Sequence, residues 1–384
     1  MSLVVLSAYN VVNFPDGGGH FWVYMQYVQG LRRLGYDVYW MEEFRPTGDP
    51  EQDALLLSTF SARMERFGIG GNLLLYVDTS TAASRGGAIE FLGRNRSEAE
   101  AIIAQASLLF NFHYAINPAL LALFKRSALI DIDPGLLQFW ISRGQLRVPR
   151  HTLYFTIGET VGRSGAMVPD CGLRWNHIHP PVSLEQWPYV FDPAADVFST
   201  VSNWDADDWV VDNGDSFENT KRVAFLKFAR MPRLTSQPLE LALFMGTLKD
   251  EEERRELEER GWRIRQSREV ADTPEKYQTY IQRSRGEFSC TKPSYVKFRT
   301  AWVSDRTLCY LASGKPVVVQ DTGPSSFLPN GEGMFRFSTA EEAAQALEII
   351  NSDYERHCRA ARRLAETYFD ANHVAGKILE YSLQ

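Results

Sequence analysis

Cysteine is scarce in this chain of 384 residues: there are four, and no two of them form a CxxC pair. That scarcity argues against a zinc ribbon and against a disulfide framework. Long apolar runs are lacking as well, because no stretch approaches the roughly 20 apolar residues of a membrane span. The first strand-like run begins near Val4, which leaves no room for a signal peptide. Together with the free thiols, these absences lead us to expect a cytoplasmic protein without a membrane span.

An excess of basic charge is also missing, because the formal net charge is −7. An acidic chain has no general electrostatic hold on nucleic acid, which requires basic surface to displace counterions. We therefore expect no extended nucleic-acid binding, while a local basic pocket for a phosphate stays compatible with this charge. A Gly-x-Gly-x-x-Gly motif is absent too, which argues against a nicotinamide dinucleotide site.

The length suits two globular domains, since domains cluster at about 100–200 residues. Strand-like and helix-like patterns alternate in the first half, which predicts parallel strands joined by helices in a doubly wound sheet. The expected strands are 2–8, 37–41, 73–77, 108–112, 128–132 and 152–157, and the expected helices are 20–34, 55–67, 98–105 and 118–124. A loop-rich segment extends from about residue 148 to 188 and includes the crossing to the second half.

The same alternation starts again in the second half. Strands are expected at 196–202, 239–244, 262–265, 286–289, 317–320 and 333–337, and helices at 217–229, 250–260, 274–283, 304–313, 341–350, 354–368 and 373–383. The predicted fold class is therefore α/β, with two facing Rossmann-like, doubly wound domains and a helical C-terminal tail. We assign residues 1–188 and 189–384 to the two domains and expect the last helix to cross back onto the first domain.

Ligands in open α/β sheets bind beyond the carboxyl ends of the strands, so the residues that follow strands are the candidate site. The first such segment is Asp-Gly-Gly-Gly-His at positions 16–20. Gly18 and Gly19 allow close approach to a ligand at a helix N-terminus, or else they form a flexible turn. His20 is a candidate general base, since its ordinary pKa lies near neutrality, or else it caps or packs the helix.

The second segment holds two carboxylates at a strand end, Asp131 and Asp133. Residues two apart on a strand point to the same side, which suits polar substrate hydroxyls, and helix capping is the alternative. We name Asp133 with His20 as catalytic candidates and add Asp16, Asp131 and Glu159 as candidate substrate contacts. No histidine stands beside the two aspartates, so we expect no metal site.

The third segment follows the expected strand 286–289 and is rich in cations. Lysine and arginine are the natural partners of a diphosphate in an acidic protein, and a helix that begins near residue 304 adds its N-terminus. Asp305 suits hydrogen bonds from ribose hydroxyls, or else it only complements the helix dipole. The candidate ligand-binding residues here are Lys292, Tyr295, Arg299, Ser304, Asp305 and Arg306.

The helix-like segment from residue 304 ends in Leu-Ala-Ser-Gly-Lys-Pro-Val-Val at 311–318, and Gln-Asp-Thr-Gly follows at 320–323. This run resembles the donor-binding region of GT-B glycosyltransferases, in which a helix ending in Ala-x-Gly-x-Pro-Val leads to a strand and a loop under the sugar nucleotide. The resemblance makes the candidate residues of the third segment donor-binding residues, and it adds Gly18, Gly19, Asp321 and Thr322 to the donor side. The glycine loop and the arginine-bearing C-terminal helices are also similar, but the first half matches only in outline.

The resemblance implies a glycosyltransferase that moves a sugar from a nucleotide-diphosphate sugar, such as a UDP-sugar, to a hydroxyl or amine acceptor. It implies a donor held by the C-terminal domain, an acceptor held by the N-terminal domain, and no cofactor or obligatory metal. We therefore place Asp16, Asp131 and Glu159 on the acceptor side. Cys309 stands where many retaining members carry a glutamate, so the stereochemical outcome stays open. A sugar-nucleotide epimerase of the same fold and a non-catalytic nucleotide- or sugar-binding protein are the alternatives.

Overall fold

The computed structural model describes residues 2–79, 89–204, 209–212, 215–246 and 248–383. These residues form two separate sheets, each built mainly from parallel strands joined by helices. The predicted α/β class with two doubly wound sheets is therefore confirmed. The change from one sheet to the other lies between residues 177 and 198, and the predicted domain boundary at residue 188 falls inside this segment.

The first sheet has the strand order β4-β3-β2-β1-β5-β6-β7-β8, and only the pair of β3 with β4 is antiparallel. Its central strand β1 is fully buried at Val4, Val5 and Leu6, as expected for a strand covered on both faces. The strands are β1 Leu3–Ser7, β2 Asp37–Glu43, β3 Leu73–Asp78, β4 Ile89–Leu92, β5 Ala106–Asn111, β6 Ser127–Asp131, β7 Leu153–Thr156 and β8 Trp175–His177.

The second sheet is parallel throughout and has the order β13-β12-β9-β14-β15-β16. Its strands are β9 Phe198–Asn203, β12 Leu239–Phe244, β13 Arg263–Gln266, β14 Gly286–Ser289, β15 Val317–Gln320 and β16 Met334–Phe337. A separate antiparallel hairpin consists of β10 Trp209–Asp212 and β11 Asp215–Glu218.

Helices follow most strands. In the first half they are α1 Gly18–Arg33, α2 Pro50–Arg66, α3 Arg96–Gln105, α4 Pro118–Leu121 and α5 Leu136–Ser142. In the second half they are α6 Lys221–Lys227, α7 Leu248–Glu259, α8 Ser267–Ala271, α9 Pro274–Arg283, α10 Pro293–Phe298, α11 Asp305–Ala312, α12 Ala340–Ser352, α13 Tyr354–Leu364 and α14 Ala371–Leu383. Short 3-10 and π segments occupy Met231–Arg233 and Ala365–Phe369. None of the helices in the described ranges combines the length and apolar character needed to cross a membrane.

The helix expected at 217–229 needs a correction, because its first residues are not helical. Residues up to Glu218 belong to β11, and α6 begins only at Lys221 after the extended residue Thr220. The spacing of the two phenylalanines, Phe217 and Phe225, fits a helix locally, but Phe217 pairs with Val210 of β10. Pairing with the strand that directly precedes it in the chain thus overrides the local helical periodicity of this segment.

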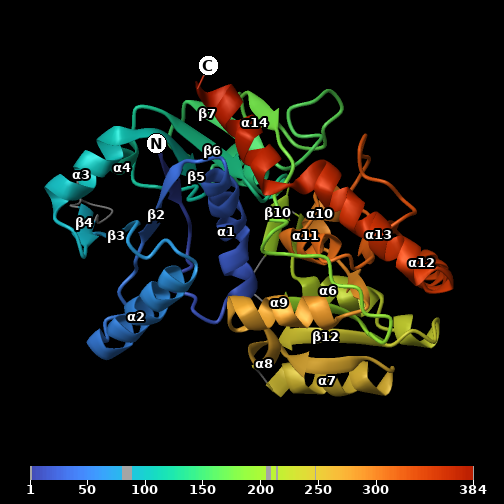
Figure 1. Cartoon of the computed structure of the whole chain (residues 1–384). Coiled ribbons are helices and arrows are strands. Elements are labelled where there is room, and N and C mark those ends of the chain that lie inside the picture. The colour runs from blue at the N-terminus through green and yellow to red at the C-terminus, as the bar shows by residue number, and fades with distance from the viewer. Residues whose placement is uncertain (1, 80–88, 205–208, 213–214, 247, 384) are drawn as a thin grey trace.

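The C-terminal helix α14 returns to the first half of the molecule and packs along α1 (Figure 1). The approach is close, since a Cβ on Gly30 of α1 would lie 2.3 Å from the carbonyl oxygen of Ala371. Lys377 of α14 donates to the carbonyl of His177 at 3.1 Å. At its other end α1 meets α9, where the Trp22 indole donates to the carbonyl of Pro274 at 3.0 Å. Helix α1 therefore contacts the C-terminal helix and a helix from the middle of the second half.

Candidate active site

Each sheet has a point at which the connections diverge. In the first sheet β1 lies between β2 and β5, and in the second β9 lies between β12 and β14. Such points are where open α/β sheets bind ligands, beyond the carboxyl ends of the strands. Loops that follow β1, β6, β9, β13 and β14 line one cavity, and loops that follow β1, β5, β6 and β7 line a second one. The strand-end rule therefore locates both cavities.

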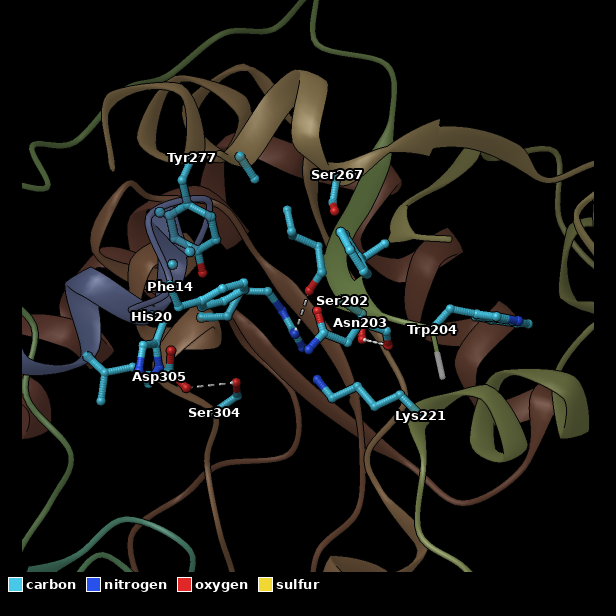
Figure 2. A pocket seen from close by; sticks show the side chains of 18 of the residues that line it. Phe14, His20, Ser202, Asn203, Trp204, Lys221, Ser267, Tyr277, Ser304 and Asp305 are labelled. Atoms are coloured by element: carbon cyan, nitrogen blue, oxygen red, sulfur yellow. Dashed lines mark hydrogen bonds between the residues drawn. The ribbon is translucent and has the colours of Figure 1, made fainter. Parts of the chain in front are cut away.

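The first cavity has a volume of about 420 Å³ and is lined by both halves of the chain (Figure 2). Its first-half wall includes Phe14, His20 and Asp133, and its second-half wall includes Asn203 and Tyr277. A volume of this size lies within the usual range of small-molecule sites. The cavity thus lies between the domains, where the two sheets face each other.

Basic side chains distinguish this first cavity. Its lining contains Lys221, Arg268, Lys292 and Arg306. In Figure 2, Lys221 points across the cavity toward the side on which His20 lies. Burial and the nearby Arg306 lower the pKa of Lys221 to about 7. An anion placed among these groups would gain charge-assisted hydrogen bonds.

Arg306 is almost buried and is held by several contacts within the protein. Its side chain is only 7% exposed and pairs with Glu287 at 2.8 Å. It also donates to the carbonyl of Val201 at 2.9 Å and to the Ser289 hydroxyl. Arg306 therefore fixes the ends of strands β9 and β14 at the cavity, with its charge already partly offset.

The glycine loop before α1 is shaped by contact between the domains. A Cβ on Gly18 would lie 2.3 Å from the carbonyl oxygen of Thr273, and one on Gly19 would lie 2.7 Å from the Tyr277 ring. Both glycines also line the first cavity. They are needed because the loop approaches the α8–α9 turn too closely for any side chain, and this approach presents His20 at the third position of α1.

The second cavity is larger, at about 670 Å³, and is lined mainly by the first half of the chain. Aromatic rings make up much of its wall, among them Tyr24, Tyr27, Phe112 and Trp140. The rings pack on one another, with centroids 5.3 Å apart for Tyr24 and Phe112 and 4.8 Å apart for Tyr27 and Phe112. No lysine or arginine appears in its described lining.

The two cavities adjoin. His20, Val23, Asp133, Trp302 and Asp305 line both of them. His20 and Asp133 come from the first half of the chain, and Asp305 is the first residue of α11 in the second half. A group bound in one cavity can therefore meet a group bound in the other beside an imidazole and two carboxylates.

The imidazole of His20 is held in a defined orientation. Its Nε2 lies 2.7 Å from the carbonyl oxygen of Tyr9. A carbonyl only accepts, so Nε2 carries the hydrogen and the lone pair of the neutral ring lies on Nδ1. Burial lowers the pKa of His20 below its ordinary value, although the Tyr9 carbonyl and nearby carboxylates oppose this shift. His20 is therefore neutral near pH 7 and able to accept a proton at Nδ1.

The carboxylate of Asp133 is constrained by two phenols. Tyr295 donates to Oδ1 at 3.0 Å across the domain boundary, and Tyr114 donates to Oδ2 at 3.2 Å. Burial raises the pKa of Asp133, while Lys292 and the phenols partly counteract this. Both oxygens already accept hydrogen bonds, so Asp133 is better suited to fix the site and place negative charge there than to take a proton.

Asp131, at the end of β6, holds the segment that carries Asp133 in place. It is fully buried and accepts hydrogen bonds from Thr156 at 2.7 Å and from Gln138 at 2.8 Å. It also accepts from the backbone amide of Asp133 at 2.9 Å. Burial raises its pKa to about 7. Asp131 lines neither of the two large cavities, so its contacts are those of a residue that positions Asp133.

Glu159 lies at a contact between the domains. Its carboxylate accepts hydrogen bonds from the Ser325 hydroxyl at 2.6 Å, the Ser326 amide at 3.0 Å and the Ser326 hydroxyl at 2.6 Å. The side chain is 4% exposed and lines neither large cavity. Asp16, also expected on the acceptor side, lines the first cavity instead and pairs with Arg268 at 3.3 Å.

Three of the expected donor residues lie outside the first cavity. Arg299 is exposed in a left-handed conformation at the end of α10, with φ of 50°. Asp321 pairs with Arg336 at 3.5 Å, and the Thr322 hydroxyl donates to the carbonyl of Trp302. Thr322 borders only a small third cavity of about 20 Å³. The other expected donor residues, namely Gly18, Gly19, Lys292, Tyr295, Ser304, Asp305 and Arg306, line the first cavity.

Sequence reasoning did not single out Lys221 and Arg268, which line the same cavity. The prediction of one helix over residues 217–229 places Lys221 on an ordinary helix face, so the sequence pattern gives no sign that this lysine binds a ligand. Arg268 lies two residues after the end of β13 at Gln266, so the rule that ligands bind beyond strand ends points to it once the strand is extended from residue 265 to Gln266. Among the described residues, no group of three or more His, Cys, Asp or Glu side chains is placed to hold a metal ion.

No protein-family model and no curated protein sequence matches this chain. Its structure is similar to solved glycosyltransferase structures. An alpha-glucosyltransferase in complex with UDP-glucose and DNA containing an abasic site has a TM-score of 0.61 at 10% identity, covering 100% of this chain and 99% of that one. HepE from Anabaena in complex with UDP and glucose has a TM-score of 0.57 at 11% identity, covering 99% of each chain. The chain therefore has the fold of these nucleotide-sugar glycosyltransferases over its whole length, as the GT-B resemblance predicts.

Proposed function

We propose that this protein is a glycosyltransferase that moves a sugar from a nucleotide-diphosphate sugar to a hydroxyl or amine acceptor. The observation that carries this proposal is the pair of adjoining cavities, one basic and one aromatic, which share His20 and two carboxylates. A group transfer between two bound molecules requires this arrangement, because the reacting atoms must be held in contact. The fold supports it, since solved structures of this fold are complexes with UDP and UDP-glucose.

In the proposed reaction the first cavity holds the donor. Lys221 and Lys292 contact the diphosphate and stabilise the negative charge that develops as the bond to the sugar breaks. Arg306 holds the ends of the strands behind them through its ion pair with Glu287. The sugar itself lies toward His20 and Asp305, where the two cavities join. At the start of α11, the Asp305 carboxylate accepts hydrogen bonds from hydroxyls of the donor, and the Ser304 hydroxyl donates one to the donor.

The acceptor lies in the second cavity with its nucleophile beside His20. Because Nε2 is bonded to the Tyr9 carbonyl, Nδ1 accepts the proton as the acceptor oxygen bonds to the sugar carbon. The Tyr9 carbonyl and the carboxylates of Asp133 and Asp305 then stabilise the imidazolium that results. The leaving nucleoside diphosphate departs with the bonding electron pair into the basic cavity.

No metal ion or cofactor has a part in this proposal, because four cationic side chains border the donor cavity. Turnover is measured in the presence of EDTA and again with added manganese. Equal turnover supports catalysis by the protein's own cations. Loss of all activity in EDTA with recovery in manganese contradicts it.

The donor is identified first by thermal shift with a panel of nucleotide sugars, starting with UDP-glucose, since a ligand that binds the folded state raises its melting temperature. UDP alone is expected to bind through the diphosphate. Lys221→Ala is expected to weaken UDP binding, because it removes one of the cations proposed to contact the diphosphate. Lys227→Ala is the matched control, because Lys227 is exposed at the far end of the same helix. Donor turnover in water with no acceptor, together with a changed sugar configuration, indicates the epimerase. Binding with no turnover of any kind indicates a non-catalytic binding protein.

A further inference from the structure

The side chains that line the second cavity indicate which kind of acceptor it can bind. Seven aromatic residues line it: Tyr9, Tyr24, Tyr27, Phe112, Tyr114, Trp140 and Trp302. Aliphatic residues fill the spaces between them, including Leu146, Ile157 and Pro181. Aromatic faces favour flat rings and apolar bodies, and such contacts add to the free energy gained by burying apolar area.

Charge is nearly absent from this wall. The carboxylates of Asp133 and Asp305 are its charged groups in the described lining, and both lie at the junction with the first cavity. The remaining titratable groups are histidines and tyrosines. Burial lowers the pKa of His113 to about 4, so this ring is neutral near pH 7. Away from the junction the cavity therefore presents no charged side chain.

The cation near the rim does not change this balance. Arg45 lies 4.8 Å from the centroid of the Tyr9 ring and donates to the Asn10 side chain at 3.3 Å. It is not part of the cavity lining. An anionic acceptor would lose its hydration inside the cavity without a partner of opposite charge, and it would face the carboxylates at the junction. A neutral molecule avoids both costs.

We infer that the acceptor is a compact, neutral molecule with an aromatic or otherwise apolar ring body and one nucleophilic hydroxyl, and that it binds in the second cavity with this hydroxyl toward His20. This inference rests on the proposed function and names the substrate class for its acceptor side. A volume of about 670 Å³ accommodates a molecule of two to a few fused or linked rings. A polyanion such as DNA lacks the partner cations here that phosphates require.

The probes are naphthol and hydroxynaphthoate, which share a ring body and a hydroxyl and differ by one carboxylate. Binding of each is measured by isothermal titration to the whole chain, with UDP present. Naphthol is expected to bind at least about tenfold more tightly, because the carboxylate must give up hydration in a wall without cations. With UDP-glucose as donor, glucosylated naphthol is the expected product. Equal or tighter binding of hydroxynaphthoate overturns the inference.

The location is tested by filling the cavity. Leu146→Trp and Ala115→Trp each add bulk to the lining of the second cavity, and Ala115 is exposed, so the fold tolerates the larger side chain. Both variants are expected to weaken naphthol binding at least about tenfold while UDP binding stays the same. Leu123→Trp is the matched control, because Leu123 is 39% exposed and lines neither cavity. Unchanged naphthol binding in both cavity variants overturns the location.

A short duplex DNA with a hydroxymethylated base is the third probe. Sugar transfer to this DNA, or binding tighter than that of naphthol, overturns the inference in favour of a polyanionic acceptor. The proposed function fails separately: if UDP and nucleotide sugars do not bind, the first cavity is not a donor site, whatever naphthol does. If donors bind and naphthol does not, the proposed function stands and the acceptor class is wrong.

Discussion

The first cavity has four lysine and arginine side chains in its lining, whereas the described lining of the second has none. The second has seven aromatic residues in a smaller set of lining residues, and the first has six in a larger set: Phe14, Trp204, Phe244, Tyr277, Tyr295 and the shared Trp302. Both cavities lie at carboxyl ends of parallel strands, so the fold determines their position but not their chemistry. The difference indicates a division of labour in which one cavity binds by charge and the other by apolar contact.

The shared residue His20 offers the strongest test of this division. His20→Ala is expected to lower kcat by about 10²–10⁴, the usual contribution of a positioned general base. UDP and naphthol affinities are expected to change far less than kcat, because His20 contacts only the reacting ends of the two ligands, and most of their binding contacts lie elsewhere in the two cavities. In the unaltered protein the acidic limb of kcat/KM should have an apparent pKa below that of an ordinary histidine, because burial lowers the pKa of His20.

Steady-state kinetics, together with separate binding titrations of UDP and naphthol, check this prediction. Near-normal turnover in His20→Ala, with a product that retains the donor's configuration, contradicts the role as base. His20 would then be a residue that contacts the sugar, and the glycosyl transfer would proceed without a protein base.

Lys292→Ala is expected to affect only the basic cavity. Loss of one charge-assisted hydrogen bond to the diphosphate should weaken donor binding by about 1.5–3 kcal/mol. Naphthol binding should not change, because Lys292 does not line the second cavity. Lys297→Ala is the control, since Lys297 is exposed on the same helix and lines neither cavity. Titration calorimetry with UDP measures both; equal UDP affinity in the two variants would remove Lys292 from the site.

Lys221 is expected to make the UDP affinity of the first cavity depend on pH. Its pKa in the ligand-free protein is lowered to about 7 by burial and by Arg306. UDP requires the protonated amine, so binding raises this pKa. Affinity is therefore full below about pH 7 and falls by up to about tenfold per pH unit as the pH rises above it. Lys221→Arg should remove the slope, because an arginine stays charged throughout this range. An unchanged slope in the arginine variant contradicts the assignment, and naphthol binding gives the reference profile.

Hydrogen bonds from Ser325 and Ser326 to the Glu159 carboxylate hold the two halves of the chain together at a place away from both cavities. Burial raises the pKa of Glu159, but hydrogen bonds from Ser325 and Ser326 outweigh burial and leave it below its ordinary value. A carboxylate with a lowered pKa stabilises the fold above its ordinary pKa near 4.5, and this contribution is lost as the pH falls through the folded-state pKa. Glu159→Gln is expected to lower the free energy of unfolding by about 1–3 kcal/mol.

Denaturant unfolding at neutral and acidic pH measures this effect. Glu185→Gln is the control, because the Glu185 side chain is 62% exposed and its ion pair with Arg33 lies on the surface. Such pairs contribute little. Equal free energies of unfolding for the two variants at neutral pH would show that the hydrogen bonds of Glu159 do not stabilise the fold. The intrinsic UDP affinity should be the same in both.

The smallest effect is expected for Arg299, which the sequence placed with the donor. Arg299→Ala should leave UDP affinity within about twofold, because the side chain is exposed outside the basic cavity and no diphosphate contact is available to it. Alanine adopts the left-handed backbone there no worse than arginine does. A loss of UDP affinity comparable to that of Lys292→Ala would show that the donor extends further along α10 than the first cavity indicates.

Much of the fold could be predicted from periodicity, because strands and helices in parallel α/β domains alternate regularly. The strand-end rule then led to His20, Asp133, Lys292 and Asp305, which lie together. It could not separate Asp131 from Asp133, since two neighbouring carboxylates have the same local pattern. Only the buried partners Thr156 and Gln138 reveal which one supports the other.

The aromatic cavity could not be predicted in the same way. Its wall combines residues from five strand-end loops and from α1, α5 and the turn at Pro180, which are far apart in the chain. Each aromatic residue by itself fits a core position as well as a binding wall. Glu159 shows the same difficulty, because its partners Ser325 and Ser326 belong to the other half of the chain.

The most direct test of the division is whether both ligands bind at once and meet at His20. Inter-ligand nuclear Overhauser effects are measured in His20→Ala, which keeps both cavities and is expected to turn over only slowly, with UDP-glucose and naphthol present together. The predicted result is a signal between the anomeric proton of the glucose and the naphthol proton next to its hydroxyl. Simultaneous binding of the two without such a signal, or competition between naphthol and UDP for one cavity, would contradict the account.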